Sequence, residues 1–264
     1  MTLAAQVRRA RFRSKVLRRP LVVVRHRGLR PNDALVVSYP RSGLTWTVFM
    51  LRHALTGVPA TFGNLNEAIP YLGAHAQVPG ILADGGRLIR SHETLDVGPR
   101  RVVYLVRDPR SVVLSEYRWQ LMSGYFAGSL SDFVDDFLSG AANPWGAWDR
   151  HVRRWSAHQE RTSGPLQVVR YEDLRRDPAG ELARVLGFLG DETPPDRLEE
   201  IVTANDLTAM RQSERDTSIP KVREDLDFVG EGGVAAWRDQ LPADASARIT
   251  ARFGETIARA GYVP

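Results

Sequence analysis

The chain has 264 residues, 43% of them hydrophobic and 25% charged, a length and composition typical of one large globular domain. It contains no cysteine, which excludes disulfides, thiolate metal sites and thiol nucleophiles. Its longest apolar runs are a handful of residues, much shorter than a membrane-spanning helix. We expect no transmembrane segment and a cytoplasmic location.

The first 30 residues form a predicted basic arm. Residues 1–30 contain ten Arg or Lys and no acid, whereas the rest of the chain has 26 basic and 31 acidic residues. The pI of 9.9 therefore reflects this arm. Such an arm could touch nucleic acid or, peripherally, an anionic membrane. We favour a solvated, partly helical arm that packs on the body and has no specific nucleic-acid partner.

Four short, valine-rich runs predict the strands of a parallel sheet. They lie at residues 34–39, 87–91, 101–106 and 166–171. Their apolar residues are continuous and do not alternate with polar ones, as is typical of strands buried on both faces. Helical patterns occur between and after them, at residues 46–55, 109–122, 131–138, 146–160, 178–189, from Pro194 to about 205, and 243–260. This order predicts a single α/β domain over residues 31–264, with helices flanking a central parallel sheet.

The first strand leads into SYPRSGLTW, residues 38–46. A strand-to-helix turn presents free backbone N–H groups at a helix N-terminus, where the helix dipole favours an anion. Ser42 and Thr45 can add hydroxyl donors, Gly43 permits close backbone approach, and Arg41 can add a charged guanidinium. The P-loop pattern G-x-x-x-x-G-K-[ST] is absent, because the basic residue precedes the glycine. An ordinary βα turn is the alternative, but Pro-Arg-Ser-Gly-x-Thr-Trp as a unit is more specific.

The second strand ends in LIRSHETL, which places Arg90 and His92 near its carboxyl end. Alternate strand residues point the same way, so we expect these two side chains to share a face. A lone histidine in a strand is more often structural. Ligands bind at the carboxyl ends of strands in open α/β sheets, however, and imidazole is well suited to accepting a proton near neutral pH.

The third strand runs into a helix in VVYLVRDPRSVVLSEYRW, residues 102–119. Arg107 stands at the strand end, and Ser115 follows two turns along the helix that begins near Pro109. The Arg and the Ser could together hold a second phosphate. Equally, Asp108 could cap the helix while Arg107 pairs with a surface carboxylate. This segment alone does not decide between the two.

Taken together, these three segments resemble the sulfotransferases that use 3′-phosphoadenosine 5′-phosphosulfate (PAPS), the cytosolic sulfotransferase-like branch with a P-loop-like α/β fold. The order and spacing match over about residues 34–264. The resemblance implies that YPRSGLTW binds the 5′-phosphosulfate, through Arg41, Ser42, Gly43, Leu44, Thr45 and Trp46. It also implies that Arg107 and Ser115 bind the 3′-phosphate and that His92 is the catalytic base.

Two further segments, NPWGAWDRHVRRW (143–155) and VVRYEDLRRDP (168–178), are similar to the same family. The resemblance implies that Tyr171 lies near the adenine and that Trp46 stacks on it. Around residue 207, where the family has an aromatic residue against the adenine, this chain has Leu207. The dimerisation motif of many relatives is absent from RDQLPADASA, so we assign no oligomeric state.

The chain departs from the family at several cations. Lysine is usual where Arg41 and Arg90 stand, and the pKa of arginine is too high for proton donation. We therefore expect Arg41 to stabilise charge and not to transfer a proton.

A second departure concerns the 3′-phosphate. The family's Arg-Lys-Gly run corresponds to residues 230–232, so Gly230 and Glu231 replace two cations while Gly232 keeps its backbone N–H. Either this loop points elsewhere, or Arg223 or Arg238 substitutes for the missing cations, or the phosphate is held less tightly.

The predicted reaction is sulfuryl transfer from PAPS to a hydroxyl, or alternatively an amine, of a small-molecule acceptor. His92 would act as general base, while Arg41 and Arg90 would offset charge on the bridging and sulfuryl oxygens; no metal is expected. The alternatives are a P-loop-like phosphotransferase, which the lack of G-K-[ST] disfavours, and a non-catalytic nucleotide-binding protein. Aromatic residues within 119–126 and 143–148 could line an acceptor pocket or belong to the core.

Overall fold

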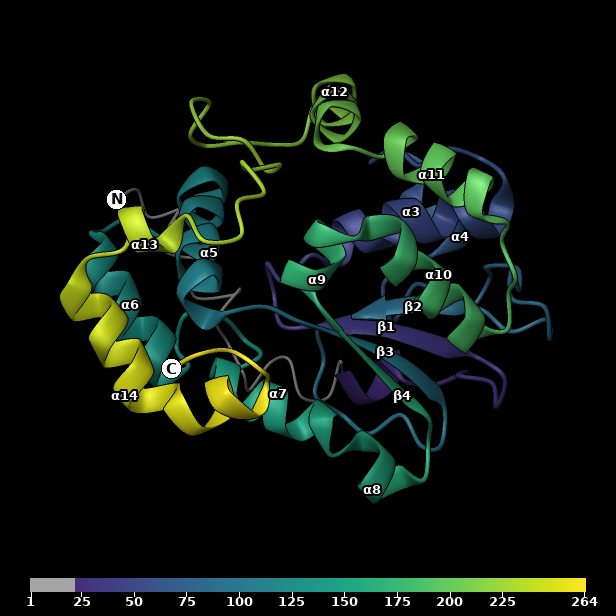
Figure 1. Ribbon diagram of the computed structural model, residues 1–264, viewed down its shortest axis with the longest axis horizontal. Coiled ribbons are helices and arrows are strands. Elements are labelled where there is room, and N and C mark those ends of the chain that lie inside the picture. The colour runs from purple at the N-terminus through teal and green to yellow at the C-terminus, as the bar shows by residue number, and fades with distance from the viewer. Residues whose placement is uncertain (1–21) are drawn as a thin grey trace.

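A four-stranded parallel sheet forms the centre of the computed structural model, which describes residues 22–264 (Figure 1). Residues 1–21 of the predicted arm lie outside the described residues. The strands are β1 (Ala34–Ser38), β2 (Leu88–Ser91), β3 (Arg101–Val106) and β4 (Leu166–Arg170), in the order β2-β1-β3-β4. The four predicted strands and their parallel arrangement are confirmed, since Val36 of β1 pairs in parallel with Arg90 of β2 and Val103 of β3.

The two faces of the sheet belong to two separate hydrophobic clusters. In β1, Ala34 and Val36 pack into one cluster, whereas Leu35 and Val37 pack into the other. All four are fully buried, which explains why the run shows no polar alternation. The sheet therefore carries helices on both faces, as the α/β pattern predicts (Figure 1).

The cluster around Val36 is built mainly by helices that follow β1 and β4. These helices are α3 (Leu44–Thr56), α4 (Leu65–Ala68), α9 (Tyr171–Arg176), α10 (Pro178–Leu189), α11 (Pro195–Ala204) and α12 (Leu207–Thr217). Other helices build the cluster around Val37. These are α5 (Pro109–Ser123), α6 (Leu130–Ser139), α7 (Trp148–Ser156), α13 (Trp237–Gln240) and α14 (Ala243–Arg259). The short helix α8 (His158–Thr162) follows α7.

Some helices differ from the predicted ones. The single helix predicted over 146–160 is two helices, α7 and α8, which meet at Ala157. Helices α4 and α9 were missed because one or two turns give too short a pattern to recognise. Helix α12 was missed because its sequence LTAMRQSERDT has few apolar residues, and Asp206, which caps it by accepting from Ala209 N, was not recognised as a start signal.

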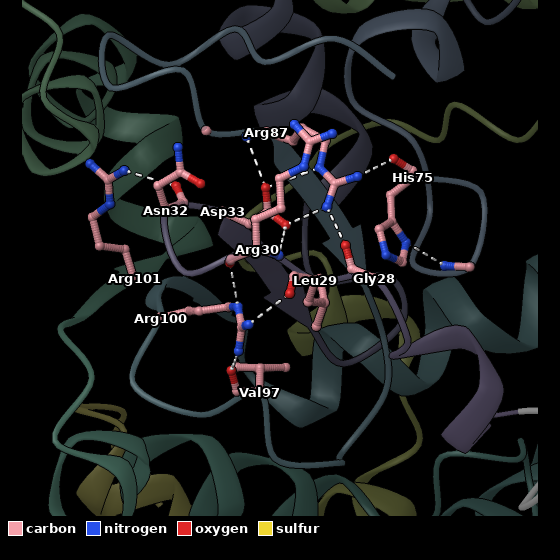
Figure 2. Close-up of polar contacts among 12 residues, drawn as sticks. Gly28, Leu29, Arg30, Asn32, Asp33, His75, Arg87, Val97, Arg100 and Arg101 are labelled. Atoms are coloured by element: carbon pink, nitrogen blue, oxygen red, sulfur yellow. Dashed lines mark hydrogen bonds and ion pairs between the residues drawn. The ribbon is translucent and has the colours of Figure 1, made fainter. Parts of the chain in front are cut away.

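A buried ion pair closes the sheet edge at which β1 and β2 begin. Arg87 donates to Asp33 through Nε (3.0 Å) and Nη2 (2.6 Å), and both side chains are almost fully buried. Nη1 and Nη2 also donate to backbone oxygens, at 2.7 Å from His75 O and 2.7 Å from Gly28 O (Figure 2). The charge is therefore paired and each guanidinium nitrogen has an acceptor, as a buried arginine requires.

The described end of the predicted arm packs on the domain. Arg100 donates to the carbonyls of Leu29 and Arg30, at 3.0 Å and 2.8 Å, and so ties residues 29–30 to the segment before β3 (Figure 2). Val22 is buried at its start. Within residues 22–264, no helix combines the length and the apolar character that crossing a membrane requires.

Candidate active site

A cavity of about 690 Å³ opens where the parallel strands end. Its walls include the residues that directly follow all four strands: the loop after β1, His92 after β2, Arg107 after β3 and Tyr171 after β4. Carboxyl strand ends are where open α/β sheets bind ligands. Ten of the twelve predicted site residues line this cavity: Arg41, Gly43, Leu44, Thr45, Trp46, His92, Arg107, Ser115, Tyr171 and Gly232. The other two, Ser42 and Arg90, do not.

The loop between β1 and α3 has an unusual backbone. Gly43, the residue before α3, has φ of 98°, and a Cβ there would lie 2.6 Å from Tyr171 Cδ2, so only glycine fits. Arg41 also has a positive φ, 64°, which a side chain rarely adopts and which the surrounding contacts must maintain. No side chain of the described residues caps α3, so its first N–H groups have no side-chain acceptor there, an arrangement typical of helix N-termini that bind anions. The hydroxyl oxygen of Ser42 is buried and has no hydrogen-bond partner among residues 22–264.

Arg41 reaches across the cavity to two distant segments. Its Nε donates to Ser115 Oγ at 3.0 Å, and its Nη2 donates to the carbonyl of Phe228 at 2.8 Å. Burial lowers the pKa of Arg41, and this guanidinium forms no ion pair with any described residue. A charge in such surroundings is well placed to attract an anionic ligand.

Arg107 lies beside Arg41 and is likewise without a carboxylate among the described residues. It donates to Arg41 O (3.1 Å) and Gly233 O (3.0 Å), and it stacks 4.1 Å from the Tyr171 ring centre. Its Nε is buried with no partner among those residues. Asp108 does cap α5 and pairs with Arg110 at 2.7 Å. The alternative given for this segment was that Asp108 caps the helix while Arg107 pairs with a surface carboxylate. The cap is present, but Arg107 forms no ion pair with any residue from 22 to 264.

The His92 ring is hydrogen-bonded to the backbone carbonyl at the end of the neighbouring strand β1. Its Nδ1 lies 2.8 Å from Ser38 O, and because a carbonyl can only accept, this nitrogen carries the proton. In the neutral ring, Nε2 is then the nitrogen that accepts a proton. The ring packs edge-on to Trp145, with centres 5.0 Å apart.

A second histidine, His151, supports the backbone of His92. Its Nε2 lies 3.2 Å from His92 O, and Tyr104 donates its hydroxyl to Nδ1 at 2.9 Å. Burial lowers the pKa of His151 to about 3, so the ring stays neutral. Sequence inspection did not single out this residue, because a histidine within NPWGAWDRHVRRW gives no signal of its depth.

The residues predicted to surround the adenine come together. Trp46 meets Tyr171 edge-on at 6.4 Å between ring centres, and Tyr171 donates its hydroxyl to Gly232 O at 3.1 Å. A Cβ on Gly232, where φ is 68°, would lie 2.8 Å from Leu207 Cδ1. Leu207, at the position where the family has an aromatic residue, therefore lies beside Gly232 and lines the cavity.

Comparison with known proteins decides the family. The family model for the sulfotransferase domain matches residues 31–261. The chain belongs to the sulfotransferase family. The prediction of a PAPS-dependent sulfotransferase, and with it of an enzyme, is confirmed at this level.

Individual relatives are similar over most of the chain. Sulfotransferase 1A1 of Rattus norvegicus is 25% identical over 257 residues, which covers 86% of this chain and 85% of the relative. Sulfotransferase 2A1 of Mus musculus is 25% identical over 262 residues, with 89% and 87% covered.

Solved structures share the fold. Retinol dehydratase, in a complex with androsterone and the inactive cofactor PAP, superposes with a TM-score of 0.74 at 19% identity and covers 89% of this chain and 83% of its own. Mouse sulfotransferase SULT7A1, in a complex with PAP, gives a TM-score of 0.68 at 18% identity, with 86% and 84% covered. These likenesses confirm the predicted sulfotransferase fold.

Neither Arg223 nor Arg238, the two candidate substitutes for the missing cations at residues 230–231, lines the cavity. Arg223 pairs with Asp225 at 2.6 Å, and Arg238 stacks on Trp237. Glu231, by contrast, does line it.

Two other arginines that the sequence analysis missed line the cavity instead, Arg118 and Arg25. Arg118 follows Ser115 by one helical turn, a spacing that could have revealed it, and it donates to Gln240 Oε1 at 3.1 Å. Arg25 comes from the predicted arm and lies 3.7 Å from Glu93, a placement no sequence pattern signals.

Arg90 does not line the cavity that Arg41 and His92 share. Strand β2 ends at Ser91, so His92 lies one residue beyond it, and the Tyr71 ring contacts both Arg90 and His92. Arg90 lines a neighbouring cavity of about 390 Å³ instead. Among residues 22–264, no group of three or more His, Asp or Glu side chains could hold a metal ion.

Proposed function

We propose that the protein transfers the sulfuryl group of PAPS to a hydroxyl or amine of a small-molecule acceptor, with His92 as the general base. One observation carries this proposal. The cavity at the strand ends joins a helix N-terminus and two arginines, none with a capping or carboxylate partner in residues 22–264, to a histidine whose Nε2 can accept a proton. Solved relatives with this fold hold PAP, which is 3′,5′-adenosine bisphosphate and the product of such a reaction.

The donor would lie along the cavity from Trp46 to Ser115. Its adenine would meet Trp46 and Tyr171, and its 5′-phosphosulfate would meet the free N–H groups of α3 and the hydroxyl of Thr45. The 3′-phosphate would accept from Arg107 and Ser115. In this arrangement Arg41 bridges the two ends, because it already donates to Ser115.

The transfer itself is an in-line displacement at sulfur. The acceptor oxygen or nitrogen forms the new bond to sulfur while the bond from sulfur to the bridging phosphate oxygen breaks, and PAP leaves with that electron pair. His92 takes the acceptor proton at Nε2, and Arg41 offsets the negative charge on the leaving oxygen. Positioning and electrostatics supply most of the rate, as in phosphoryl transfer.

The decisive experiment is a calorimetric titration with PAP and with ATP, followed by turnover of labelled PAPS against an acceptor library in the presence of EDTA. We expect tight PAP binding, weaker ATP binding and transfer without magnesium. Magnesium-dependent phosphoryl transfer from ATP would instead support a phosphotransferase. Tight PAP binding without transfer to any acceptor would support a non-catalytic binding protein, and absence of PAP binding would overturn the proposal.

A further inference from the structure

A second cavity adjoins the proposed donor site. It measures about 390 Å³ and shares four lining residues with the larger cavity: Thr45, Tyr71, Trp119 and Phe228. Its other walls include the aromatic rings of Phe62 and Tyr125. The shared wall includes Thr45, which we propose contacts the 5′-phosphosulfate of PAPS. A molecule in the second cavity would therefore lie next to the sulfuryl group that is transferred.

Among the described residues, Arg90 is the one charged side chain that lines this second cavity. It is only 5% exposed, yet it forms no ion pair with any residue from 22 to 264. It donates to the neutral Asn66 Oδ1 at 2.6 Å and stacks 4.1 Å from the centre of the Tyr71 ring. Its Nε is buried without a partner in that same range of the chain.

A buried guanidinium without a counter-charge destabilises a fold unless other interactions compensate for the free energy of hydration that it loses. Arg87, which directly precedes the same strand, shows the usual solution, since Asp33 neutralises it at 2.6 Å. Burial lowers the pKa of Arg90, although arginine remains protonated at neutral pH. The structure of the described chain therefore leaves a positive charge for a ligand to neutralise.

We propose that the second cavity binds an acceptor with an aromatic body and a carboxylate, and that Arg90 recognises the carboxylate. This inference rests on the proposed sulfuryl transfer, and it adds the chemical class of the acceptor. The aromatic walls suit a flat apolar body, and a guanidinium suits a carboxylate because two parallel N–H donors match its two oxygens.

Tyr71 lies between His92 and Arg90, and its distances to the two residues limit how long this acceptor can be. The Tyr71 ring centre lies 5.9 Å from that of His92 and 4.1 Å from Cζ of Arg90. The imidazole and the guanidinium are thus at most about 10 Å apart. A phenol with a short carboxylate arm spans a distance of this order, with its hydroxyl at His92 and its carboxylate at Arg90.

The competing role for Arg90 is the one predicted from the sequence, stabilisation of the transferring sulfuryl group. The two roles differ in what they make the rate depend on. An arginine at the sulfuryl group affects every acceptor equally, whereas an arginine that binds the acceptor affects only acceptors that carry the anion.

The test uses matched acceptors that differ only in charge: 3-(4-hydroxyphenyl)propanoate against its amide, and 6-hydroxy-2-naphthoate against its amide. For each, KM and kcat are measured with labelled PAPS, and the dissociation constant is measured on the enzyme with and without PAP. We expect the wild type to prefer each carboxylate tenfold or more in KM and in dissociation constant. Arg90→Met should abolish that preference, with a loss on the carboxylates that exceeds any loss on the amides tenfold or more, and Arg90→Lys should keep part of it.

Arg197→Gln is the control variant, because Arg197 pairs with Glu200 on α11, lines neither cavity, and its replacement removes the same net charge. The melting temperature of Arg90→Met provides a second readout: it should equal or exceed that of the wild type, since an unpaired buried charge is removed.

Equal binding of carboxylates and amides by the wild type would overturn the inference. So would an equal loss on both in Arg90→Met, which would support the sulfuryl role. Because the dissociation constants need no turnover, they decide the inference even if transfer fails. Failure of PAP binding, by contrast, would contradict the proposed function alone.

Discussion

At the scale of single residues, a hydrogen bond to β1 sets the tautomer of His92. Its Nδ1 donates to the carbonyl of Ser38, the last residue of β1, so in the proposed transfer Nε2 is the nitrogen that takes the acceptor proton. His92→Ala should lower kcat by about 10²- to 10⁴-fold, the range typical for loss of a general base. PAP affinity should change little, because none of the proposed nucleotide contacts involves this ring. Steady-state kinetics and PAP titration check both, with His26→Gln, outside the cavity, as control. Activity near the wild-type level would show that another group takes the proton.

His151 links burial to pH dependence. Burial lowers its pKa from the usual value near 6.5 to about 3, so in the unfolded chain it takes up a proton at pH 5 that the folded chain does not. The unfolded state therefore gains stability as pH falls below 6.5, and the free energy of unfolding decreases. Between pH 7 and pH 5, wild type should lose about 2 kcal/mol more than His151→Gln, whose side chain does not titrate.

Urea denaturation of the two proteins at both pH values measures this difference. Burial also lowers the pKa values of His53 and His75, but both residues are present in each protein, so their contributions cancel in the comparison. Parallel pH profiles for wild type and variant would show that His151 is protonated in the folded state.

At the scale of elements, the segment between α12 and α13 forms one wall of the cavity. Its backbone is held by Glu214 of α12, which accepts from Phe228 N at 2.7 Å and Val229 N at 2.8 Å. Two residues further on, Glu231 faces the same cavity that Arg41 and Arg107 line. The segment thus brings a negative charge to the site that we propose binds the anionic donor.

Reversing that charge should therefore strengthen donor binding. Glu231→Lys is expected to lower the PAP dissociation constant roughly three- to tenfold at low salt, and less at high salt, because exposed charges are screened. Adenosine 5′-monophosphate is the matched ligand control, and its affinity should change less if Glu231 lies near the 3′-phosphate. Calorimetry with both nucleotides makes the comparison. An equal gain for both would place the charge near the 5′ end.

At the scale of the whole molecule, one end of the sheet carries the proposed active site and the other end carries a buried ion pair that stabilises the fold. The proposed reaction takes place at the carboxyl ends of the strands, whereas Asp33 and Arg87 close the amino ends (Figure 2). Asp33→Ala should lower the free energy of unfolding by about 3–5 kcal/mol, because it leaves a buried arginine unpaired. Replacing both partners with apolar residues, as in Asp33→Leu with Arg87→Met, should recover much of that loss.

Urea denaturation measures these changes, and Asp225→Ala is the control because the Asp225–Arg223 pair is exposed and should contribute little. The PAP affinity of whatever fraction of Asp33→Ala remains folded should match that of the wild type. A double variant as unstable as the single one would show that the pair stabilises the fold by more than mutual neutralisation.

The strands, the layered α/β order and the glycine-containing loop between β1 and α3 could all be predicted from the sequence alone. These features follow from local rules: continuous valine-rich runs predict buried strands, and a strand followed by a small-residue turn predicts an anion site at a helix start. Strand ends in a parallel sheet lie at one edge, so the sequence also brought together the loop after β1, His92 and Arg107. The family resemblance rested on the same segments.

Which arginine lines which cavity could not be predicted from the sequence and became evident only in the folded structure. Arg41 meets Phe228, which is 187 positions away, and Arg90 lines a second cavity although its strand was predicted correctly. The burial of His151 and the position of Arg118 were equally hidden in the sequence. The physical reason is that periodicity fixes the face of an element, whereas the direction and the partners of a long side chain depend on packing between segments far apart in the sequence.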